Sequence, residues 1–356
     1  MWPRRCAESM SVPLSTPTDA RPAVRTAGLV KSYGGSRALD DVTLDIPEGE
    51  LVALIGANGS GKSTLLKILF GILPSDAGEI SVLGIDPLRD QPRLRAIAGY
   101  AGQEVALDGE ITGWETLRLF YALRRLPHRE RADRLGRIID EYALGAFCDR
   151  RVAGFSGGER QRLHLALETM HEPRLLLLDE PTSSLDPGGR RALWGRLASL
   201  RDAGHTIIVS SHDLPDVAAY CDRVALLEHG RLRALDRPDA LVRSHGRACT
   251  TITLARRMGE DAERLRAELA PLAPEVAVDN FTVTIWRDRH PDGVEPALAI
   301  LSERGIPYTR YERGEPDLAG AYFRLTGNTL APVASSGTGG GRGRRGGGRG
   351  QGRGRS

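Results

Sequence analysis

The sequence predicts an α/β domain with a mainly parallel sheet, followed by a smaller α+β domain of ferredoxin-like type. Three observations predict this fold class. Short apolar runs alternate with helical patterns over the first two thirds of the chain, a glycine-rich loop joins one such run to a helix, and a strand-helix-strand-strand-helix-strand order begins at about residue 248. The length of 356 residues accommodates two domains and tails, and 40% apolar with 27% charged residues are typical of a globular protein.

The expected strands of the large domain are short and apolar, so helices should cover both faces of their sheet. They span residues 50–55, 174–178 and 206–210. The functional edge of such a sheet lies at the carboxyl ends of its strands. Between about residues 105 and 170 the pattern is mainly helical, with a capping box from Thr112 to Glu115 and an apolar repeat that starts at Leu135. We therefore expect a helical insert in this domain.

The remaining segments are a small domain, expected at residues 248–328, and two tails. In the small domain we expect strands at 249–254, around Ala277, at 281–286 and at 308–313, with helices at 261–269 and 294–303. Residues 1–24 are rich in proline, serine and threonine, and residues 329–356 end in a stretch of glycine and arginine. We expect both tails to be disordered, because neither has the apolar side chains that pack into a core.

The composition excludes several classes of protein. No apolar run approaches the roughly 18 residues that a membrane helix needs, and the N-terminus lacks the apolar core of a secretory signal. The four cysteines show no CxxC pairing, which favours free thiols over disulfides or a zinc cluster. The formal charge of +3 becomes −3 without the six arginines of the C-terminal tail. We therefore expect a cytoplasmic protein with a mildly acidic folded body.

The strongest motif is a phosphate loop from Gly56 to Thr64, which matches G-x-x-x-x-G-K-[ST] directly after an apolar strand and directly before a helix. Glycines let backbone N–H groups surround phosphate oxygens, and the helix N-terminus adds the positive end of its dipole. The alternative is a simple glycine-rich turn, which the position after a strand disfavours. Lys62 would reach the β and γ phosphates, and Ser63 would bind Mg²⁺. The expected nucleotide contacts in this loop are Gly56, Asn58, Gly59, Ser60, Gly61, Lys62, Ser63 and Thr64.

A second motif is a pair of acids at the end of a buried strand, where Leu175 to Leu178 is followed by Asp179 and Glu180. Asp179 would hold Mg²⁺ through water, and Glu180 would orient and deprotonate the attacking water. This pattern is weak alone, since apolar strands often end in solvated acids.

A third motif, from Phe155 to Gln161, reads Phe-Ser-Gly-Gly-Glu-Arg-Gln and precedes a helical run with Leu163 and Leu165. In isolation a capping box, in which Ser156 and Glu159 start a helix, explains it equally well. The order of the motifs favours a functional interpretation, because the phosphate loop comes first, this box second and the acidic strand immediately after.

This arrangement resembles that of ABC ATPases over residues of about 26 to 245. The segment from Phe155 to Gln161 is similar to the signature motif of the family, with phenylalanine in place of the usual leucine and Glu159 where glutamine is commoner. Gln103 resembles the Q-loop glutamine, Ser183 to Asp186 resembles the D-loop, and His212 resembles the switch histidine.

The resemblance implies a P-loop NTPase fold for residues 25–247, with ATP and Mg²⁺ as ligands. It also implies that two nucleotide domains dimerise head to tail, so that each ATP lies between the phosphate loop of one copy and the signature helix of the other. The implied catalytic residues are Lys62, Gln103, Glu180 and His212, and the implied Mg²⁺ ligands are Ser63, Gln103 and Asp179. Outside the phosphate loop, the implied nucleotide contacts are Tyr33, which would stack on adenine, Gln103, Ser156, Gly157, Gly158 and Asp186.

Two flanking segments indicate the type of ABC protein. Residues 107–127 and 316–327 resemble exporters of the ABC-2, drug-resistance type. This implies an ATP-hydrolysing subunit at the cytoplasmic face of the membrane that works with a separate permease to export a drug, lipid or glycan. The alternative is a soluble ABC ATPase that acts on nucleic acid or ribosomes, which the Gly/Arg tail supports. Relatives of that kind usually carry two cassettes, long coiled coils or zinc modules, and we find none of these in the sequence.

The tail and the small domain have open roles at this point. The tail is either a nonspecific contact for an anionic partner, such as nucleic acid or anionic lipid, or a solvated extension. For the small domain we expect a role in assembly or regulation.

Overall fold

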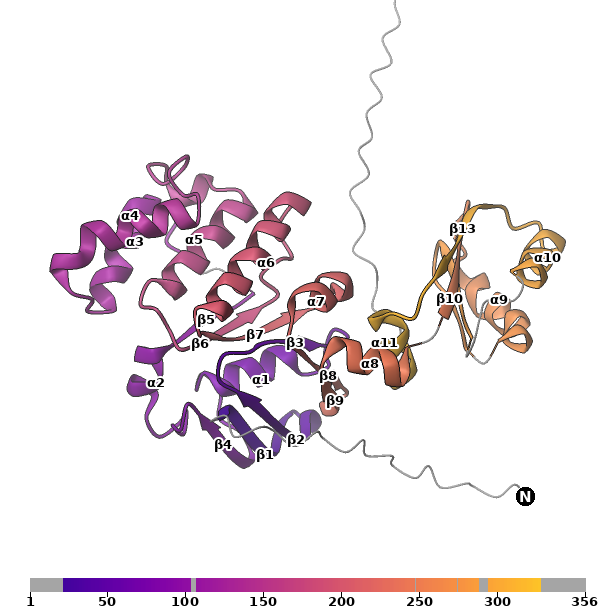
Figure 1. The fold of residues 1–356 in the computed structure, drawn as a ribbon, viewed down its shortest axis with the longest axis horizontal. Coiled ribbons are helices and arrows are strands. Elements are labelled where there is room, and N and C mark those ends of the chain that lie inside the picture. Colours follow the sequence, from indigo (N-terminus) through magenta and orange to yellow (C-terminus); the bar gives the residue numbers. More distant parts are fainter. Residues whose placement is uncertain (1–21, 104–106, 247, 274, 288–293, 328–356) are drawn as a thin grey trace, which may run out of the picture.

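The computed structural model describes residues 22–103, 107–246, 248–273, 275–287 and 294–327. These residues form the expected large α/β domain and a small α+β domain, which Figure 1 shows on opposite sides of helices α8 (Pro238–His245) and α11 (Leu318–Thr326). The first strand begins at Pro22, so residues 22–24, which we expected in the N-terminal tail, belong to a sheet. Residues 1–21 and 328–356, for which we predict disorder, lie outside the described residues.

The centre of the large domain is a six-stranded sheet in the order β5-β6-β7-β3-β8-β9. Its strands are β3 (Leu51–Ile55), β5 (Ala98–Ala101), β6 (Leu175–Asp179), β7 (Thr206–Ser211), β8 (Arg223–Glu228) and β9 (Arg231–Asp236). All neighbours pair in parallel except β8 and β9. Every residue of β3, β6 and β7 is buried, which is the pattern of parallel strands covered on both faces.

Alternate residues of β3 point into two separate parts of the core. The helices that flank the sheet are α1 (Lys62–Leu69), α6 (Pro187–Asp202) and α7 (Leu214–Tyr220). Leu51, Ala53 and Ile55 join the apolar cluster that includes residues of α6, α7 and the helical insert. Val52 and Leu54 join a second cluster with residues of α1. The strand that leads into the phosphate loop is therefore fixed from both sides.

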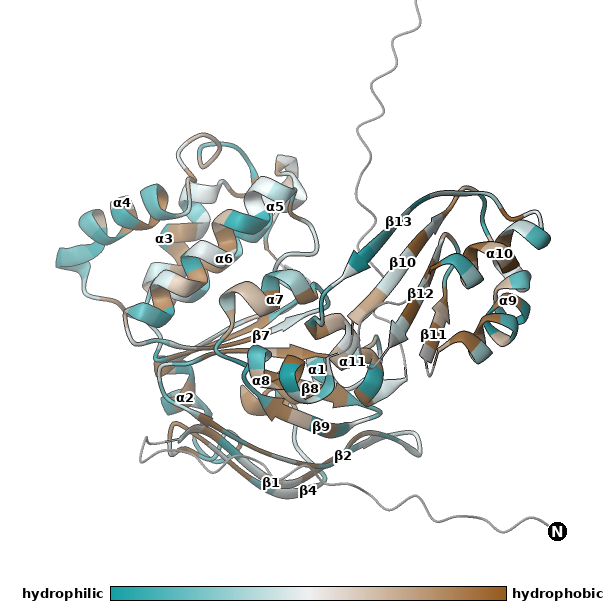
Figure 2. Cartoon of the chain, turned by 45° about the vertical axis from the view of Figure 1, so that its right-hand side comes forward, coloured by the Kyte–Doolittle hydropathy of each residue, from teal (hydrophilic) through white to brown (hydrophobic). Residues whose placement is uncertain are grey.

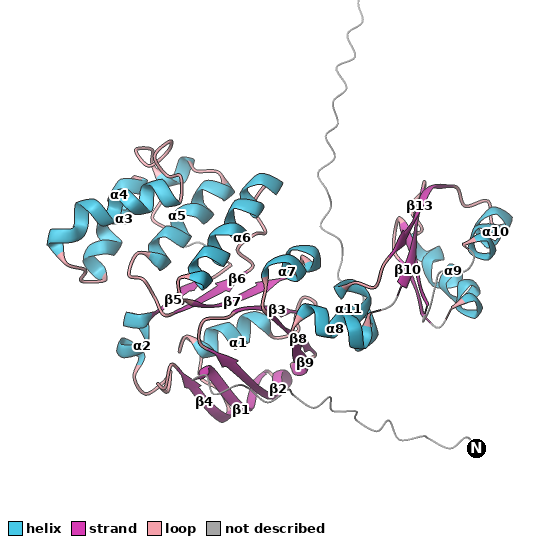
Figure 3. Ribbon diagram, viewed as in Figure 1, coloured by secondary structure: helices cyan, strands magenta, loops and turns pink. Residues whose placement is uncertain are grey.

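A three-stranded antiparallel sheet, which we did not predict, packs on the other side of α1 (Figure 3). Its strands are β1 (Pro22–Tyr33), β2 (Ser36–Pro47) and β4 (Ala77–Val82), in the order β2-β1-β4. Several register shifts interrupt the pairing of β1 with β2, so the strands lack the strict alternation of apolar and polar residues that marks a strand in a sequence. As a result, α1 and the loop before it are held between two sheets.

The helical insert lies beside the carboxyl edge of the central sheet. Its elements are α3 (Gly113–Leu123), α4 (Arg131–Glu141) and α5 (Gly157–Thr169), with 3₁₀ turns at His128–Glu130 and Val152–Gly154. Helix α2 (Gln91–Ile97) precedes the insert and leads into β5. The predicted capping box is confirmed: the Thr112 N–H donates to Glu115 Oε2 at 2.7 Å, and the Glu115 N–H donates to Thr112 Oγ1 at 3.2 Å. Leu135, Ile138 and Tyr142 of the predicted apolar repeat are buried in the core.

The small domain has the element order that we predicted. Its elements are β10 (Ala248–Leu254), α9 (Ala262–Leu269), β11 (Glu275–Val278), β12 (Thr282–Arg287), α10 (Glu295–Glu303) and β13 (Tyr308–Gly314), with 3₁₀ turns at Gly259–Asp261 and Ala270–Leu272. The antiparallel sheet has the order β11-β12-β10-β13, and both helices lie on one of its faces (Figure 2). Ile252, Val283, Leu265 and Leu301 belong to an apolar cluster of its own.

Helix α11, which we did not predict, brings the end of the described chain back to the large domain, where it packs against α7 and α8. Asp317 caps its N-terminus by accepting from the Gly320 N–H at 2.8 Å, and Gly327 ends it with a φ of 68°. Phe323 stacks on Trp286 of β12 with 4.0 Å between ring centroids. The helix therefore touches both domains.

Two predictions about the whole chain concern membrane spans and cysteines. Among the described residues, none of the helices has the length and apolar character that crossing a bilayer requires. Cys148, Cys221 and Cys249 are free thiols, and Cys6 lies outside the described residues.

Candidate functional site

The phosphate loop lies between the end of β3 and the start of α1, as predicted. Gly59 and Gly61 adopt φ values of 80° and 105°, and a Cβ at Gly61 would come within 2.4 Å of the Ala38 carbonyl oxygen. Only glycine allows this backbone to approach so closely. The loop therefore presents its N–H groups at the N-terminus of α1, which is the geometry that binds phosphate.

Lys62 is buried inside this loop. Its ammonium group donates to the Gly56 carbonyl at 2.7 Å and to the Ala57 carbonyl at 3.1 Å. Burial lowers the pKa of Lys62, while the carboxylates of Glu180 and Asp179 oppose that shift. The lysine thus lies between the loop and the acidic end of β6, where a phosphate group can replace its carbonyl partners.

The two acids follow β6 as the sequence predicts, and the neighbouring strand holds them. Asp179 is 2% exposed, and its Oδ1 accepts a hydrogen bond from Ser210 Oγ of β7 at 2.8 Å. The same Ser210 Oγ accepts from the Glu180 N–H at 2.7 Å. Glu180 has a φ of 49°, a conformation that costs a non-glycine residue about 1 kcal/mol or more and that occurs often at functional sites.

His212 follows β7 and faces Glu180. Its Nδ1 lies 4.0 Å from Glu180 Oε1, and both side chains are less than half exposed. Tyr100 lies on the neighbouring strand β5, and burial together with the nearby charge of Asp179 raises the pKa of Tyr100 to about 12. The structure therefore brings together Lys62, Asp179, Glu180 and His212, which the sequence supplies from three separate segments.

Gln103 and Tyr33 lie at the margins of this group. Gln103 is exposed and follows β5, which pairs with β6 so that Ala101 is opposite Leu178. It therefore lies at the same edge of the sheet as Asp179. Tyr33 ends β1 and is 49% exposed, with Lys31 Nζ 5.8 Å from its ring centroid. An exposed aromatic face of this kind is available to stack on a base.

The signature segment forms a separate site. Ser156 caps α5, and a full capping box with Glu159 is present: the Ser156 N–H donates to Glu159 Oε2 at 2.8 Å, and the Glu159 N–H donates to Ser156 Oγ at 3.2 Å. A Cβ at Gly157 would lie 3.2 Å from Ser184 Cβ of the D-loop, so the two segments pack closely. Asp186 caps α6 by accepting from the Gly189 N–H at 3.1 Å.

A cavity of about 410 Å³ lies beside this segment. Among the described residues it is lined by Ser156, Gly158, Leu185, Asp186 and neighbours from α5, α6 and the end of α4, with no contribution from the phosphate loop. Among the described residues, the cavity beside the signature segment and a cavity beside the phosphate loop share no lining residue, so we call the two segments half-sites.

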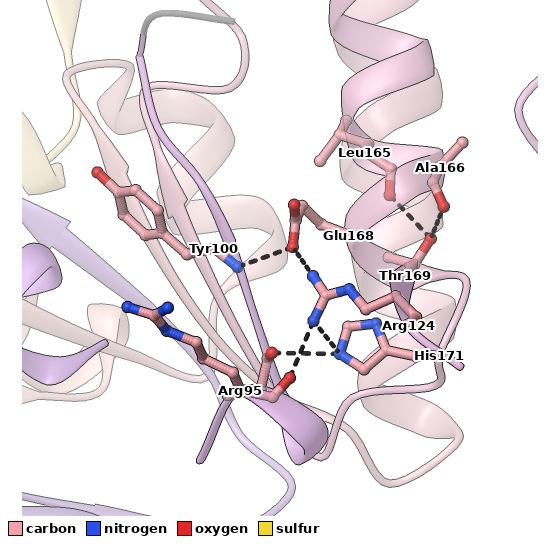
Figure 4. A network of polar contacts seen from close by, with 9 residues as sticks. Arg95, Tyr100, Arg124, Leu165, Ala166, Glu168, Thr169 and His171 are labelled. Atoms are coloured by element: carbon pink, nitrogen blue, oxygen red, sulfur yellow. Dashed lines mark hydrogen bonds and ion pairs between the residues drawn. The ribbon is translucent and has the colours of Figure 1, made fainter. Parts of the chain in front are cut away.

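A buried polar network that we missed joins the helical insert to β5 (Figure 4). Arg124 at the end of α3 donates to Glu168 Oε2 of α5 at 2.7 Å, and the Tyr100 N–H donates to the same oxygen at 3.3 Å. Burial raises the pKa of Glu168, and the charge of Arg124 opposes this shift. Arg124 also donates to the Arg95 carbonyl at 2.9 Å. The available signal in the sequence was an acid at the end of the apolar run from Leu163 to Leu167.

The comparisons with known proteins cover most of the chain. The family model described as ABC transporter matches residues 39–183. Nod factor export ATP-binding protein I of Sinorhizobium fredii (strain NBRC 101917 / NGR234) is 34% identical over 86% of this chain and 87% of that protein. The daunorubicin/doxorubicin resistance ATP-binding protein of Streptomyces peucetius is 32% identical over 86% of this chain and 93% of that protein.

Solved structures of ABC-transporter ATP-binding proteins are also similar to this chain. An ATP-binding subunit of an ABC transporter superimposes with a TM-score of 0.59 at 32% identity, over 62% of this chain and 92% of that chain. A dimeric ATP-binding cassette in a post-hydrolysis state, bound to ADP and Pi, superimposes with a TM-score of 0.56 at 27% identity, over 60% of this chain and 98% of that chain.

The fold and the phosphate loop define a P-loop nucleotide-hydrolysing domain. The chain belongs to the ABC transporter family and is an ATP-binding subunit that hydrolyses ATP, as the order of its motifs predicts. The predicted resemblance to drug-resistance exporters is confirmed by the relatives, and the comparisons favour a transporter subunit over the nucleic-acid alternative.

Proposed function

We propose that two copies of this chain close over two ATP molecules and thereby drive export through a separate membrane permease. The observation that carries the proposal is that, among the described residues, the cavity beside the signature segment has no lining residue from the phosphate loop. The relatives are named for Nod factor export and for daunorubicin/doxorubicin resistance, which supports a drug, lipid or glycan as the exported compound. The subunit would be peripheral, at the cytoplasmic face of the membrane.

The phosphate-loop half would bind the nucleotide. Backbone N–H groups from Gly56 to Thr64 would surround the β and γ phosphates, and Lys62 would exchange its carbonyl partners for phosphate oxygens. The exposed ring of Tyr33 would stack on adenine. Together these contacts fix the triphosphate above the carboxyl edge of the sheet.

The residues at this edge also fit Mg²⁺, which prefers oxygen ligands and keeps several waters. Ser63 offers a hydroxyl, Gln103 an amide oxygen, and Asp179 a carboxylate of which Oδ1 already accepts from Ser210. The described residues contain no group of three or more His, Cys, Asp or Glu side chains that could hold a metal. A bound Mg²⁺ would therefore depend on phosphate oxygens and water, and it would neutralise phosphate charge.

Glu180 and His212 would carry the hydrolytic step. With 4.0 Å between His212 Nδ1 and Glu180 Oε1, both side chains can reach the same attacking water. Glu180 would accept a proton from that water as its oxygen attacks the γ phosphorus, and the bond from phosphorus to the ADP oxygen would break. His212 would hold the γ phosphate in line for this attack.

The signature half would act on the ATP of the second copy. Ser156, Gly157 and Gly158 begin α5, whose N–H groups and dipole stabilise negative charge. Asp186 would contribute from the adjacent D-loop. Dimer closure would thus depend on the γ phosphate and reverse after hydrolysis.

Gln103 would pass the state of the nucleotide to the permease. It follows β5, which the Arg124–Glu168 network holds against the helical insert. A shift of Gln103 on γ-phosphate binding would therefore be transmitted to the surface of the insert.

The test is to purify the tagged chain from the membranes of its native host, with nuclease and moderate salt in the wash. A co-purifying protein with about six predicted membrane helices supports the proposal. Ribosomes or nucleic acid without such a protein contradict it. Repeating the purification with a chain deleted from Gly337 onward tests the tail. Weaker membrane recruitment with unchanged ATP hydrolysis would support a contact with an anionic partner, and unchanged recruitment would support a solvated extension.

A further inference from the structure

Three arginines line a cavity near the amino end of β6. The cavity has a volume of about 270 Å³ and lies between α4, α6 and the end of α5, with Leu176 of β6 in its wall. Asp179 of the ATP site is at the other end of the same strand. Among the described residues, the lining includes none from the phosphate loop, the acidic pair or the signature segment. The cavity is therefore separate from the nucleotide site.

The lining carries more arginines than carboxylates. The arginines are Arg134 and Arg137 of α4 and Arg196 of α6, and the carboxylates are Glu141 and Glu172. Arg134 Nη2 donates to Glu172 Oε1 at 2.6 Å, and Arg196 Nη2 donates to Glu141 Oε2. Both glutamates are thus paired, which leaves the charge of Arg137 without a carboxylate partner in the lining.

Both ion pairs use the guanidinium group incompletely. A guanidinium group can bind an oxyanion with two parallel hydrogen bonds, but in each of these pairs only Nη2 donates to the glutamate. The Nε atoms of Arg134 and Arg196 are buried and lack a hydrogen-bond partner among the described residues. A buried donor without a partner is unfavourable. An oxyanion in the cavity would let each guanidinium group rotate and use its Nε.

The two paired arginines are better shielded from water than their glutamates. The side chains of Arg134 and Arg196 are 13% and 27% exposed, whereas those of Glu172 and Glu141 are 66% and 39% exposed. Exposed carboxylates hold a charged partner weakly, because water solvates them well. An anion inside the cavity can therefore compete with both glutamates, which would return to water.

The size of the cavity and the origin of its arginines restrict the ligand. Sites for drug-sized molecules have volumes of roughly 300–1,000 Å³, so this smaller cavity favours an ion accompanied by a few waters. The arginines come from two different helices. A tetrahedral oxyanion has oxygen atoms in several directions and can accept from both helices.

This cavity shares a wall with the cavity beside the signature segment. Glu141 and Arg196 line both cavities. The guanidinium carbon of Arg196 also lies 5.4 Å from the ring centroid of Tyr142, which lines the cavity beside the signature segment. An anion that draws Arg196 away from Glu141 would therefore alter the wall of the signature half.

We propose that the cavity between α4 and α6 is a binding site for a small, doubly charged tetrahedral oxyanion of the phosphate or sulfate type. The anion bridges Arg134, Arg137 and Arg196 and thereby links the helical insert to α6. The inference does not depend on the proposed role of the phosphate loop.

The test is isothermal titration of sulfate into the chain saturated with a non-hydrolysable ATP analogue and Mg²⁺. Titration of chloride at the same ionic strength is the reference. The analogue occupies the phosphate loop, which would otherwise bind sulfate as well. We expect the wild type to bind one sulfate per chain in the cavity.

Three variants identify the site. Arg137→Gln removes a charge without breaking an ion pair of the lining, and Arg134→Lys keeps the charge but removes the planar guanidinium group. Each should weaken sulfate binding by about 10-fold, because each loses a charge-assisted hydrogen bond. Arg131→Gln, at the start of the same helix and outside the lining, should bind like the wild type. Urea unfolding checks that each variant is folded, and Arg137→Gln alone decides the test if Arg134→Lys is not.

Two results would overturn the inference. Absence of sulfate binding by the wild type would leave the cavity to water, and equal weakening by Arg131→Gln and Arg137→Gln would indicate non-specific attraction to α4. Failure of the ATP analogue to bind would instead count against the proposed function of the phosphate loop. The arginine variants would still test the cavity in that case, so the two failures are distinguishable.

Discussion

The phosphate-loop half and the signature half of the site differ in how complete they are within one chain. In the first half, Lys62 is buried and has two carbonyl partners, and Asp179 is buried and bonded to Ser210. In the second half, Ser156 and Gly157 are exposed at the start of α5. The charged groups of the phosphate-loop half are therefore buried and hydrogen-bonded within one chain, whereas the start of the signature segment is exposed to solvent.

The anchoring of the signature segment supports the same distinction. Phe155 is 3% exposed and packs edge-on against Phe147 at 4.9 Å between centroids. The phenylalanine that replaces the usual leucine is thus accommodated by an aromatic partner. Phe155 thus fixes the segment in the apolar core, while Ser156 and Gly157 remain exposed at its surface.

The largest expected effect is that of Glu180→Gln. Removing the group that accepts the proton of water should lower kcat for ATP hydrolysis by about 10² to 10⁴-fold, while ATP binding stays within about twofold. Phosphate release and the binding of a fluorescent ATP analogue measure the two quantities. Glu79→Gln, a change at an exposed acid on β4, is the control. Hydrolysis near the wild-type rate would mean that Glu180 is not the base.

Gly157→Asp should break the signature half alone. The new side chain meets Ser184 and places negative charge where the γ phosphate of the partner would lie. We expect hydrolysis to fall by about 10- to 100-fold, with ATP affinity of the single chain within about twofold. Equal losses of affinity and turnover would contradict the division into half-sites.

Lys62→Ala should break the loop half. Loss of a charge-assisted hydrogen bond to phosphate should weaken ATP binding by about 10- to 100-fold, because such bonds contribute about 1.5–3 kcal/mol. Isothermal titration with ATP measures the change. Lys67→Ala, in the last turn of the same helix, should bind like the wild type. Lys62→Ala and Gly157→Asp together separate the two halves: the change in the loop should weaken ATP binding, and the change in the signature segment should slow ATP hydrolysis.

The smallest expected effect is a pH dependence of the free energy of unfolding, caused by two buried histidines in and directly after α5. Burial lowers the pKa of His164 and His171 to about 4, and the charge of Arg124 adds to the shift of His171. Below about pH 6.5 the unfolded chain takes up protons that the folded chain does not, so the free energy of unfolding should fall by about 1–2 kcal/mol per histidine between pH 7 and pH 5. The loss should continue until about pH 4.

Urea unfolding at pH 7 and pH 5 tests this expectation. Between pH 7 and pH 5, the free energy of unfolding should fall less for His171→Gln than for the wild type, by the contribution of one histidine. Comparing the two pH values within each variant removes the effect of the substitution itself on stability. An unchanged difference would show that His171 is protonated in the folded chain.

Much of the candidate site was predictable because its residues lie in a few short, contiguous segments of the sequence. The phosphate loop, the acids after β6 and His212 after β7 each follow a strand, and parallel strands bring their carboxyl ends to one edge. The capping-box and signature-motif interpretations of residues 155–161 do not exclude each other. Ser156 forms the capping box with Glu159, and Ser156 and Gly157 are still exposed at the start of α5.

The parts that were missed depend on contacts between distant residues. Arg124 and Glu168 look like ordinary helical charges until folding buries them together. Tyr322 is an unremarkable apolar-face residue until α11 returns to the phosphate loop. The antiparallel sheet that supports α1 escaped prediction because register shifts disrupt its alternation. Local patterns specify elements, but the partners of buried polar groups emerge only from tertiary structure.

The most direct measurement of the central claim is the mass of Glu180→Gln in solution with saturating ATP and Mg²⁺, by light scattering after size exclusion. Two half-sites that close over ATP predict twice the chain mass of 38.6 kDa with ATP, the single mass without it, and the single mass for Glu180→Gln combined with Gly157→Asp. A single mass at saturating ATP, or a dimer that Gly157→Asp leaves intact, would contradict the claim.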